Sequence, residues 1–326
     1  MIWLTWRQFR TQATMFTGAL TALAALLAAT GPHLAGLHTT AGSGVVSQLT
    51  GTDTALYFVG GVTVLLAPAL IGVFWGAPLV ARELESGTHR LAWNQSVART
   101  RWLLTKLTLT GLTTMAASGL ISLAVTWWSG PVDRAVAAGG SDNTDNFVHR
   151  IDPAIFSSRG IVPLGYAVFA FVHSVTFGVV IRRTLPAMAA TLAMYTAVHL
   201  SMRLWIRAHL APATTVTVPF THDRTANYLL ASVSHIDIGR PGTWTVAEQT
   251  LDATGHPAHA LPPAYADCDS IKACVGTLAG AGYRQRVTCQ AADSFWTLQW
   301  AQTGIFLGLA IALGALCVWW TRRRLS

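Results

Sequence analysis

The sequence is poor in charge, and its charged residues leave long gaps between them. Of the 326 residues, 11% are charged and 52% are hydrophobic, whereas an ordinary soluble domain has about 25% charged residues. Uncharged stretches occupy positions 11–52, 54–81, 107–132, 160–181, 184–202 and 294–321. A helix of about 20 apolar residues crosses a bilayer, where the backbone finds hydrogen-bond partners only within the helix itself. The gaps therefore predict six transmembrane helices.

The first crossing is expected at Ala13–Leu34. The others are expected at Leu56–Leu79, in a helix that ends at Trp127–Trp128, and at Ile161–Ile181, Leu185–Leu204 and Phe295–Trp320. Arg7 and Arg10 before the first run would also suit a cleaved signal peptide. The run is longer than the core of about 7–15 residues that signal peptides have, so a retained helix is the favoured interpretation.

The positions of Lys and Arg predict which side of the membrane each loop faces. With the N-terminus inside, the inner segments hold 12 of the 22 basic residues but only two of the 14 acidic ones, Glu83 and Glu85. Short cytoplasmic loops carry such an excess of positive charge. The net charge of +8 is then a signal of topology, and we expect no nucleic-acid partner. The fold class is an all-α polytopic membrane protein with six transmembrane helices, cytoplasmic N- and C-termini, and a small mixed α/β extracellular subdomain between helices 5 and 6.

Several kinds of chemistry lack the residues they need. No Asp or Glu lies in the six uncharged stretches, which disfavours proton or sodium coupling. The two lysines, Lys106 and Lys272, follow Thr105 and Ile271, so no phosphate-binding P-loop is present, and no His-Glu-x-x-His zinc motif occurs. Ser118 with His173 or His199 would supply the two side chains of a catalytic pair. The favoured interpretation of these residues is that they form hydrogen bonds across helices. We expect no cofactor or metal in this chain.

The chain divides into three parts. Residues 1–206 hold helices 1 to 5, with a cytoplasmic loop at 81–106 and an outer loop at 129–159. Residues 207–293 are polar enough to fold in water as the extracellular subdomain, and 294–326 hold helix 6 and a basic cytoplasmic tail. In the subdomain we expect strands at Trp244–Val246 and Arg284–Thr288, and a helix at Asp269–Leu278 with an aspartate cap and a glycine after its end.

Cysteines and paired glycines give two further predictions. Cys268, Cys274 and Cys289 lie in the subdomain, where oxidation is permitted, so one disulfide is expected. Cys268–Cys274 is preferred because it needs little rearrangement of the chain, with Cys289 as the alternative partner. The pairs Gly72/Gly76 and Gly304/Gly308 allow helices to approach closely, either within the protein core or in a dimer.

The inner segment 81–106 reads ARELESGTHRLAWNQSVARTRWLLTK. It has a Gly-Thr break after two glutamates, a run able to form a short helix at Leu91–Val97, and basic residues before the third crossing. A solvated loop that anchors to lipid would have a similar composition. The segment also resembles the inner loop of type 2 ATP-binding-cassette (ABC) exporter permeases, in which a Glu-x-Gly-Thr element precedes a coupling helix that docks on the ATPase. Glu85, Gly87 and Thr88 match that element.

Other segments carry the same resemblance over most of the chain. The N-terminal IWLTWRQFRTQ is similar to the interfacial helix of such permeases, RGIVPLGYAVFAF and IRRTLPAMAATLA to their fourth and fifth crossings, and SFWTLQW with CVWWTRRR to their last. The outer part 207–293 departs from the minimal form by its length.

The resemblance implies a non-catalytic permease subunit of an ATP-driven exporter in the plasma membrane of a bacterial cell. The expected partners are two ATPase subunits that bind ATP–Mg, a second permease copy, and membrane lipid. The residues expected to couple the permease to the ATPase are Glu83, Glu85, Gly87, Thr88, Arg90, Arg99 and Arg101. Many aromatic residues and the absence of carboxylates in the uncharged stretches favour an apolar or amphipathic substrate such as a drug, peptide or lipid.

Two other functions fit the sequence. A membrane-anchored sensor or scaffold would use the subdomain at 207–293 to bind a ligand without transport. An intramembrane enzyme would depend on His173 or His199. A P-loop ATPase encoded in the neighbouring reading frame would favour the exporter over both.

Overall fold

The computed structural model describes residues 2–88, 98–138, 147–220, 226–229, 232–236, 242–268 and 270–324. The chain folds as two compact units. Unit 1 comprises Met1–Arg207 and Trp296–Ser326, and unit 2 comprises Ala208–Phe295. Each unit is described separately below.

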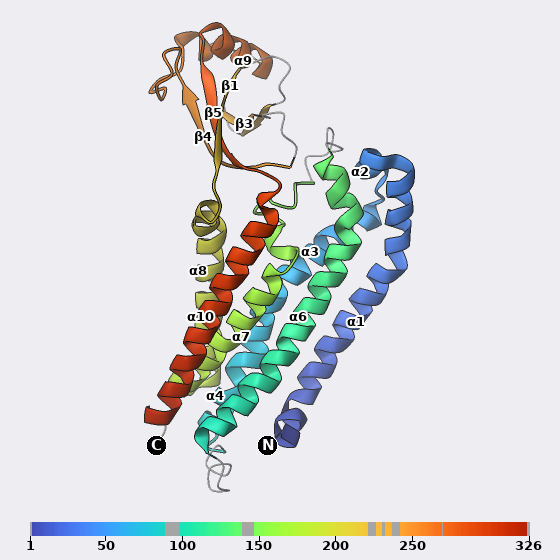
Figure 1. Cartoon of the computed structure of the whole chain (residues 1–326), viewed down its shortest axis with the longest axis vertical. Coiled ribbons are helices and arrows are strands. Elements are labelled where there is room, and N and C mark those ends of the chain that lie inside the picture. Colours follow the sequence, from blue (N-terminus) through green and yellow to red (C-terminus); the bar gives the residue numbers. More distant parts are fainter. Residues whose placement is uncertain are drawn as a thin grey trace. The chain divides into compact units, whose positions relative to one another are not determined.

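Unit 1 is a bundle of long helices (Figure 1). They are α1 (Ile2–Ala41), α2 (Val45–Gln48), α3 (Gly51–Ile71), α4 (Ala77–Glu85), α6 (Arg99–Ala137), α7 (Val162–Ile181), α8 (Thr184–Ser201) and α10 (Ser294–Arg324). A π-helical turn, η2 (Gly72–Gly76), joins α3 to α4, and a second one, η4 (Met202–Ile206), continues α8. Among the described residues, six helical segments are long and apolar enough to cross a membrane. The number of crossings predicted from the sequence is therefore reproduced.

The helices extend beyond the uncharged runs that predicted them. The third segment reaches Ala137 and thus includes Asp133, and the second begins at Gly51 and includes Asp53. The helical segments therefore hold carboxylates near their ends, beyond the uncharged runs. Asp53 and Thr50 form a capping box: Asp53 N donates to Thr50 Oγ1 at 3.2 Å, and Thr50 N donates to Asp53 Oδ2 at 3.1 Å.

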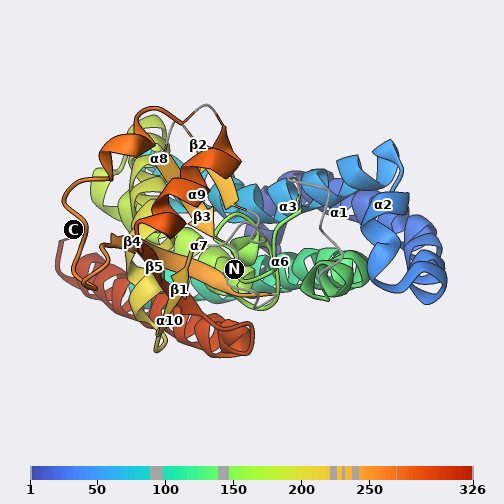
Figure 2. The ribbon, with the colours of Figure 1, turned by 90° about the horizontal axis from the view of Figure 1, so that it is seen from above.

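Helix α7 is the most enclosed of the six segments and lies among α3, α6, α8 and α10 (Figure 2). Small residues let its neighbours approach. A Cβ added to Gly72 would lie 2.9 Å from the Ala170 carbonyl oxygen, and one added to Gly178 would lie 2.8 Å from the Ala77 carbonyl oxygen. The outward faces are apolar, with Leu185, Ile311 and Leu120 each more than 60% exposed. Exposed leucine on this scale is unusual in a soluble monomer and suits a surface that lipid covers.

One end of unit 1 gathers the chain ends and two connections. At this end, called the termini end below, α1 begins and α10 ends (Figure 1). The end of α4, the start of α6 and the turn between α7 and α8 lie there as well, since α4 contacts both α7 and α8. The opposite end holds the α1–α3 connection and η3 (Phe156–Ser158), which precedes α7.

In its described residues, unit 2 combines two antiparallel sheets with the α-helix α9 (Ile271–Gly280). Strands β1 (Thr214–Pro219), β5 (Arg284–Gln290) and β4 (Trp244–Leu251) form an antiparallel sheet in that order, and β2 (Ala226–Leu229) pairs with β3 (Ser232–Ile236). Strands β4 and β5 include the two predicted segments, but the sequence analysis missed β1. The central Val216 of β1 pairs with Val287 of β5, which is fully buried. Val275 and Leu278 of α9 pack on the same core.

Details of α9 differ from the sequence prediction in one respect. The helix begins at Ile271, and its N-cap is Ser270, whose hydroxyl accepts a hydrogen bond from Ala273 N at 3.3 Å. Serine thus replaces the predicted aspartate cap at Asp269, which lies outside the described residues. Cys268 and Cys274 form a disulfide, and Cys289 is a buried free cysteine in the unit 2 core. The unit spans 208–295, against the predicted 207–293.

Candidate functional site

A buried ion pair joins α4 to α6 at the termini end. Lys106 Nζ lies 2.7 Å from Glu83 Oε1 and donates to the Leu79 carbonyl oxygen at 3.1 Å. The same ammonium lies 4.9 Å from the centre of the Trp102 ring. Only 4% of the Lys106 side chain and 13% of the Glu83 side chain are exposed. The sequence analysis grouped Glu83 with the charges that face a partner, whereas here its carboxylate braces two helices of the same chain.

The next glutamate connects α4 to α8. Glu85 Oε2 accepts hydrogen bonds from Thr184 N at 2.9 Å and from Thr184 Oγ1 at 2.7 Å. Thr184 is the first residue of α8, where a backbone N–H has no partner within the helix. Glu85 therefore caps a helix 99 residues further along the chain. A carboxylate also interacts favourably with the positive end of the helix dipole.

A tight turn follows Glu85. The Ser86 N–H and hydroxyl both donate to the Arg82 carbonyl oxygen, at 3.0 and 2.8 Å, which ends α4. The Ser86 and Thr88 hydroxyl oxygens are 3.0 Å apart. Gly87 has φ of +73°, a left-handed conformation that a residue with a side chain rarely adopts. The Glu-x-Gly-Thr element is thus a helix end with a defined change of direction.

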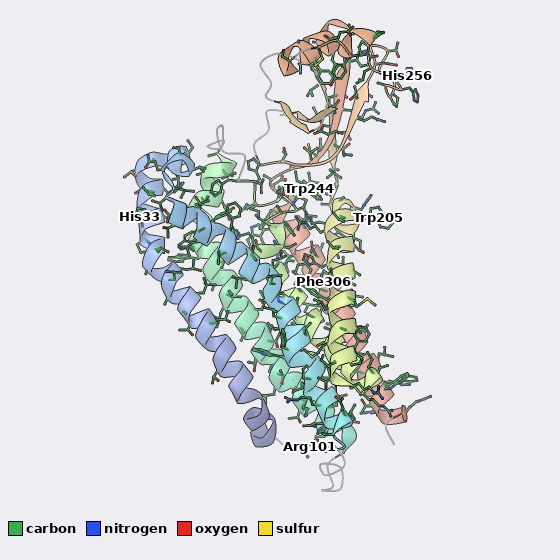
Figure 3. All side chains as sticks on the ribbon, turned by 180° about the vertical axis from the view of Figure 1, so that it is seen from behind. His33, Arg101, Trp205, Trp244, His256 and Phe306 are labelled. Carbon is green, nitrogen blue, oxygen red and sulfur yellow. A yellow bond between two sulfur atoms is a disulfide. The ribbon has the colours of Figure 1, made fainter. Side chains whose placement is uncertain are left out.

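The predicted basic residues of this segment are only partly described. Arg90 lies outside the described residues, and Arg99 is the first residue of α6, with its side chain outside them as well. Arg101 is exposed near the start of α6 (Figure 3). Arg322 Nε donates to Thr100 Oγ1 at 3.2 Å and thereby ties the end of α10 to the start of α6. Four helices are thus linked at the termini end by polar contacts.

At the opposite end, a buried charge network joins α3, α6 and the segment before α7. Arg159 Nε donates to Asp133 Oδ2 at 3.0 Å, and the Tyr57 hydroxyl donates to Asp133 Oδ1 at 2.9 Å. Ser129 Oγ donates to the same carboxylate at 3.1 Å. Burial acts to lower the pKa of Arg159, but the Asp133 carboxylate and Tyr57 outweigh it and raise that pKa.

Sequence reasoning missed this network, because Asp133 and Arg159 were assigned to an outer loop at 129–159. The signal that could have found it is the single acid Asp133, four residues after Ser129 in the run that begins at Trp127-Trp128. An aromatic pair near a membrane surface does not require the helix to end there.

Ser118 and His173, one of the two candidate catalytic pairs, have other partners. Ser118 Oγ donates to the Pro163 carbonyl oxygen at 3.1 Å, which joins α6 to α7. His173 places Nε2 3.2 Å from the Thr191 carbonyl oxygen and Nδ1 3.1 Å from the Phe169 carbonyl oxygen. These contacts hold helices together. Among the described residues, no three His, Cys, Asp or Glu side chains lie close enough to hold a metal ion.

Comparison with known proteins assigns the family. Residues 17–207, more than half of the chain, match the family model described as ABC-2 membrane transporter related. The chain belongs to this ABC-2 membrane family. No curated protein and no solved structure matches it. The resemblance seen in the sequence is thereby confirmed at the level of the family: the chain is an ABC-2-type permease, a non-catalytic, multi-pass membrane subunit of an ABC transporter assembly.

The matched part of this ABC-2 permease includes both polar clusters. Glu83, Glu85, Lys106, Asp133 and Arg159 all lie within 17–207, whereas unit 2 and α10 lie outside that range. The braced end of α4 and the charge network at the opposite end therefore belong to the part of the chain that the family model covers.

A third polar group of the permease lies between α7, α8 and α10. The Tyr166 ring lies tilted against His199, with ring centres 4.7 Å apart, and edge-on to Phe306, with ring centres 4.6 Å apart. Gln302 Nε2 donates to the Tyr166 hydroxyl. Among the described residues, the Tyr195 hydroxyl and Gln302 Oε1 find no hydrogen-bond partner although both side chains are buried. Buried polar atoms of this kind in a membrane protein are candidates for contact with a substrate or water.

The two glycine pairs occupy different environments in the permease. A Cβ added to Gly76 would overlap the Ser174 hydroxyl and lie 2.9 Å from the Phe171 carbonyl oxygen, and Gly72 is similarly close to Ala170. A Cβ added to Gly304 or Gly308 would have no described atom within 4 Å. Gly72 and Gly76 thus lie at a helix contact inside unit 1, whereas Gly304 and Gly308 lie on an open face of α10.

Proposed function

We propose that the chain is the transmembrane subunit of an ATP-driven exporter in the plasma membrane of a bacterial cell. Two copies pair with two ATPase subunits, which bind ATP–Mg in the cytoplasm. The termini end of unit 1 faces the cytoplasm, in agreement with the distribution of basic residues. Because α8 ends and α10 begins at the opposite side of the bundle, unit 2 is an extracellular subdomain.

The observation that supports coupling best is the bracing of α4. Glu83 is paired with Lys106 of α6, and Glu85 is bonded to Thr184 of α8. The turn at Ser86-Gly87-Thr88 follows directly and leads into the segment 89–98 that we propose docks on the ATPase. If the ATPase displaces this segment, α4, α6 and α8 therefore move together. A loop without these contacts would change its own conformation instead.

The remaining charges of the segment suit a partner surface. Arg90, Arg99 and Arg101 are the charges proposed to contact the ATPase, in contacts that weaken as salt increases. Closure of the ATPase subunits around ATP would then tilt α4, α6 and α8 and switch the path from inward-facing to outward-facing.

The substrate we propose is apolar or amphipathic. The spanning helices expose mainly apolar side chains, and the described carboxylates inside them have partners within the chain. The buried hydroxyl of Tyr195 and the amide of Gln302 offer hydrogen bonds to a polar group on such a substrate. A drug, peptide or lipid meets this description.

The test measures transport of an amphipathic dye per ATP hydrolysed, in proteoliposomes that contain the permease and its co-purified ATPase. Glu85→Ala removes both hydrogen bonds between Glu85 and Thr184, whereas Thr184→Val removes only the one that the Thr184 hydroxyl donates. We expect both variants to bind the ATPase normally and to keep its hydrolysis rate. Both should transport less dye per ATP, and Glu85→Ala the less of the two, because α8 then follows α4 less closely.

Thr105→Val is the matched control. The Thr105 hydroxyl donates to the Arg101 carbonyl oxygen in its own helix, at 2.8 Å. This variant should therefore transport as much dye per ATP hydrolysed as the unchanged permease. Full transport per ATP in Glu85→Ala and in a Gly87→Val variant would contradict the proposal, as would transport by the permease without any nucleotide hydrolysis.

A further inference from the structure

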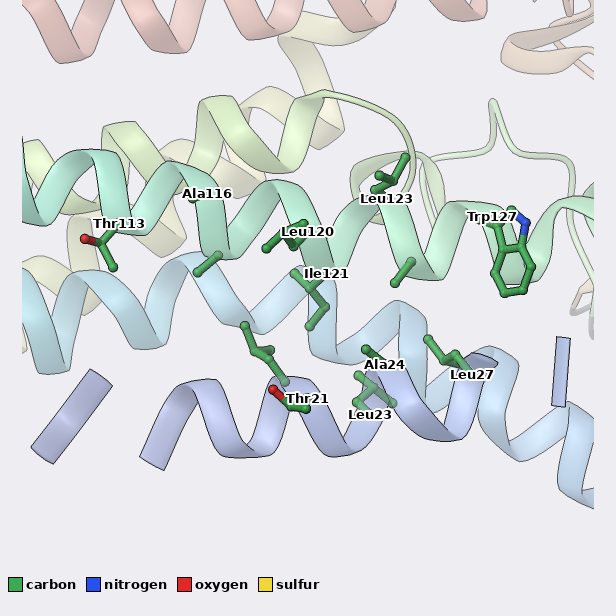
Figure 4. Close-up of a pocket in the computed structure, with 13 residues that line it drawn as sticks. Thr21, Leu23, Ala24, Leu27, Thr113, Ala116, Leu120, Ile121, Leu123 and Trp127 are labelled. Atoms are coloured by element: carbon green, nitrogen blue, oxygen red, sulfur yellow. The ribbon is translucent and has the colours of Figure 1, made fainter. Parts of the chain in front are cut away.

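An apolar groove runs between α1 and α6 on the outside of unit 1 (Figure 4). Its volume is about 680 Å³, within the range of about 300–1,000 Å³ that small-molecule sites occupy. On the α1 side it is lined by Leu20, Leu23 and Leu27, and on the α6 side by residues from Thr113 to Trp127. All of its lining residues are uncharged.

The groove is closed where the two helices touch near Trp127. A Cβ added to Gly31 would lie 2.5 Å from the Trp127 ring, so α1 and α6 are in direct contact at this point. Trp128 Nε1 donates to Thr30 Oγ1 at 2.8 Å beside that contact. Below it, small residues of α6 such as Ala116, Ala117 and Ala124 face α1 and keep the helices from filling the space between them.

Few polar atoms face the groove, and the Thr113 hydroxyl among them has a hydrogen-bond partner in its own helix. The Thr113 hydroxyl donates to the Leu109 carbonyl oxygen of its own helix at 2.9 Å. The groups that face an occupant of the groove are therefore mainly methyl and methylene groups. Such a surface selects for hydrocarbon and offers nothing to hold a charged group. An empty space of this size would forfeit the van der Waals contacts of every residue that lines it.

We propose that this groove binds one acyl chain of a membrane phospholipid. The α6 wall from Thr113 to Trp127 is about 21 Å long at 1.5 Å per residue, and one leaflet of the hydrocarbon core is about 15 Å thick. An extended chain inserted from the leaflet therefore fits along the groove. Both walls belong to candidate membrane-spanning segments, so phospholipid surrounds the opening at high local concentration.

A helix of a second copy can enter this open groove only in part. A helix about 10 Å wide and 21 Å long has a volume of roughly 1,600 Å³, more than twice the 680 Å³ of the groove. A single acyl chain enters without separating α1 from α6. The bound lipid fills the gap between α1 and the bundle and stabilises the position of α1.

The experiment uses a phospholipid that carries a diazirine in one acyl chain. The full-length permease is reconstituted at increasing ratios of this probe to unlabelled phospholipid, illuminated, digested and mapped by mass spectrometry. We expect adducts in Leu20–Leu27 and Thr113–Trp127 that saturate as the probe fraction rises. Adducts at Ile311, on an exposed face of α10, should rise in proportion to the probe, as for lipid in bulk exchange.

Two variants fill the groove from opposite walls. Ala117→Trp acts from α6 and Ala24→Trp acts from α1, so the test stands if one of them fails to fold. Both should abolish the saturable adducts. Leu112→Trp is the control, because Leu112 is 66% exposed on α6 and does not line the groove, and it should leave these adducts unchanged.

Labelling of the groove that follows the same linear dependence as Ile311 would overturn the proposal. So would saturable labelling that survives both filling variants. Intermolecular cross-links from a cysteine at Ala24 to a second permease copy, in place of lipid adducts, would show that protein occupies this face instead.

Discussion

Glu83 and Lys106 show how a single residue pair can fix two helices in a membrane protein. Both side chains are largely buried, and each would carry an uncompensated charge without the other. Removal of one partner from a buried ion pair is therefore far more damaging than removal of both. The same reasoning applies to Asp133 and Arg159 at the opposite end.

Lys106→Met tests the brace between α4 and α6. It leaves the Glu83 carboxylate buried without its cation, and we expect the free energy of unfolding in detergent to fall by about 3–5 kcal/mol. The double variant Glu83→Gln/Lys106→Met should recover most of that loss, because it removes the unpaired charge.

Arg82→Met is the matched control for this prediction. Arg82 is an exposed basic residue on α4, the helix that carries Glu83, and its replacement should change stability by less than about 0.5 kcal/mol. Equal effects of Lys106→Met and Arg82→Met would mean that the buried pair does not stabilise the bundle.

Residue roles could be read from the sequence only where a local motif carries them. Glu85, Gly87 and Thr88 were singled out by the resemblance of their motif to that of ABC exporter permeases, and their role in coupling stays a prediction. The partners of Glu83 and Glu85 were not identified, because Lys106 and Thr184 are 23 and 99 positions away and reach them only through the packing of α4 on α6 and α8. The roles of Asp133 and Arg159 were missed for the same reason.

At the scale of elements, the π-helical turn between α3 and α4 brings two glycines onto α7. Helix α7 can approach this turn because Gly72 and Gly76 carry no side chains. Short π-helical turns inside longer helices occur often at functional sites. Here the turn lies one helix before the proposed coupling segment.

Gly76→Ala is expected to destabilise unit 1. The added methyl group overlaps the Ser174 hydroxyl and the backbone of Phe171, and forced overpacking of this kind costs about 1–3 kcal/mol. The change appears as a lower midpoint of thermal unfolding in detergent.

The second glycine pair provides the comparison. Gly304→Ala meets no described atom within 4 Å, so the helix-favouring effect of alanine should leave stability unchanged or raise it by up to about 1 kcal/mol. If Gly76→Ala lowered the midpoint of unfolding no more than Gly304→Ala, the result would contradict the close packing of η2 on α7.

Element boundaries were predicted less well than element number. Charged residues were used to end each helix, but α3 begins at a capping box that includes Asp53, and α6 continues through Asp133 to Ala137. In unit 2 the strands β4 and β5 were predicted from the short segments Trp244–Val246 and Arg284–Thr288. Strand β1 was missed although its threonines and valines favour a sheet.

At the scale of the whole molecule, the two units differ in what stabilises them. Unit 1 is covered by apolar side chains and suits lipid, whereas unit 2 has a small core of its own and a disulfide between Cys268 and Cys274. The number of spanning helices and the family followed from composition and local motifs. The contacts that fix the candidate site depend on how the helices pack, which no single stretch of sequence records.

The thiol content provides a test of unit 2. The chain has four cysteines, and Cys289 and Cys317 are the two free ones. We expect a maleimide to add to two thiols in the denatured, unreduced protein and to four after reduction. Because Cys289 and Cys317 are buried, the native protein should react slowly. Four reactive thiols before reduction would contradict the disulfide.

The central claim is that the segment after α4 faces the cytoplasm and binds the ATPase. The most direct measurement is the labelling of Thr88→Cys by a membrane-impermeant maleimide in sealed vesicles of each orientation, with and without the ATPase. His259→Cys, at an exposed position in unit 2, is the control for the other side. The account predicts that Thr88→Cys is labelled only from the cytoplasmic side and is protected when the ATPase is bound, whereas His259→Cys is labelled only from outside. Labelling of Thr88→Cys from outside, or labelling that the ATPase does not reduce, would contradict it.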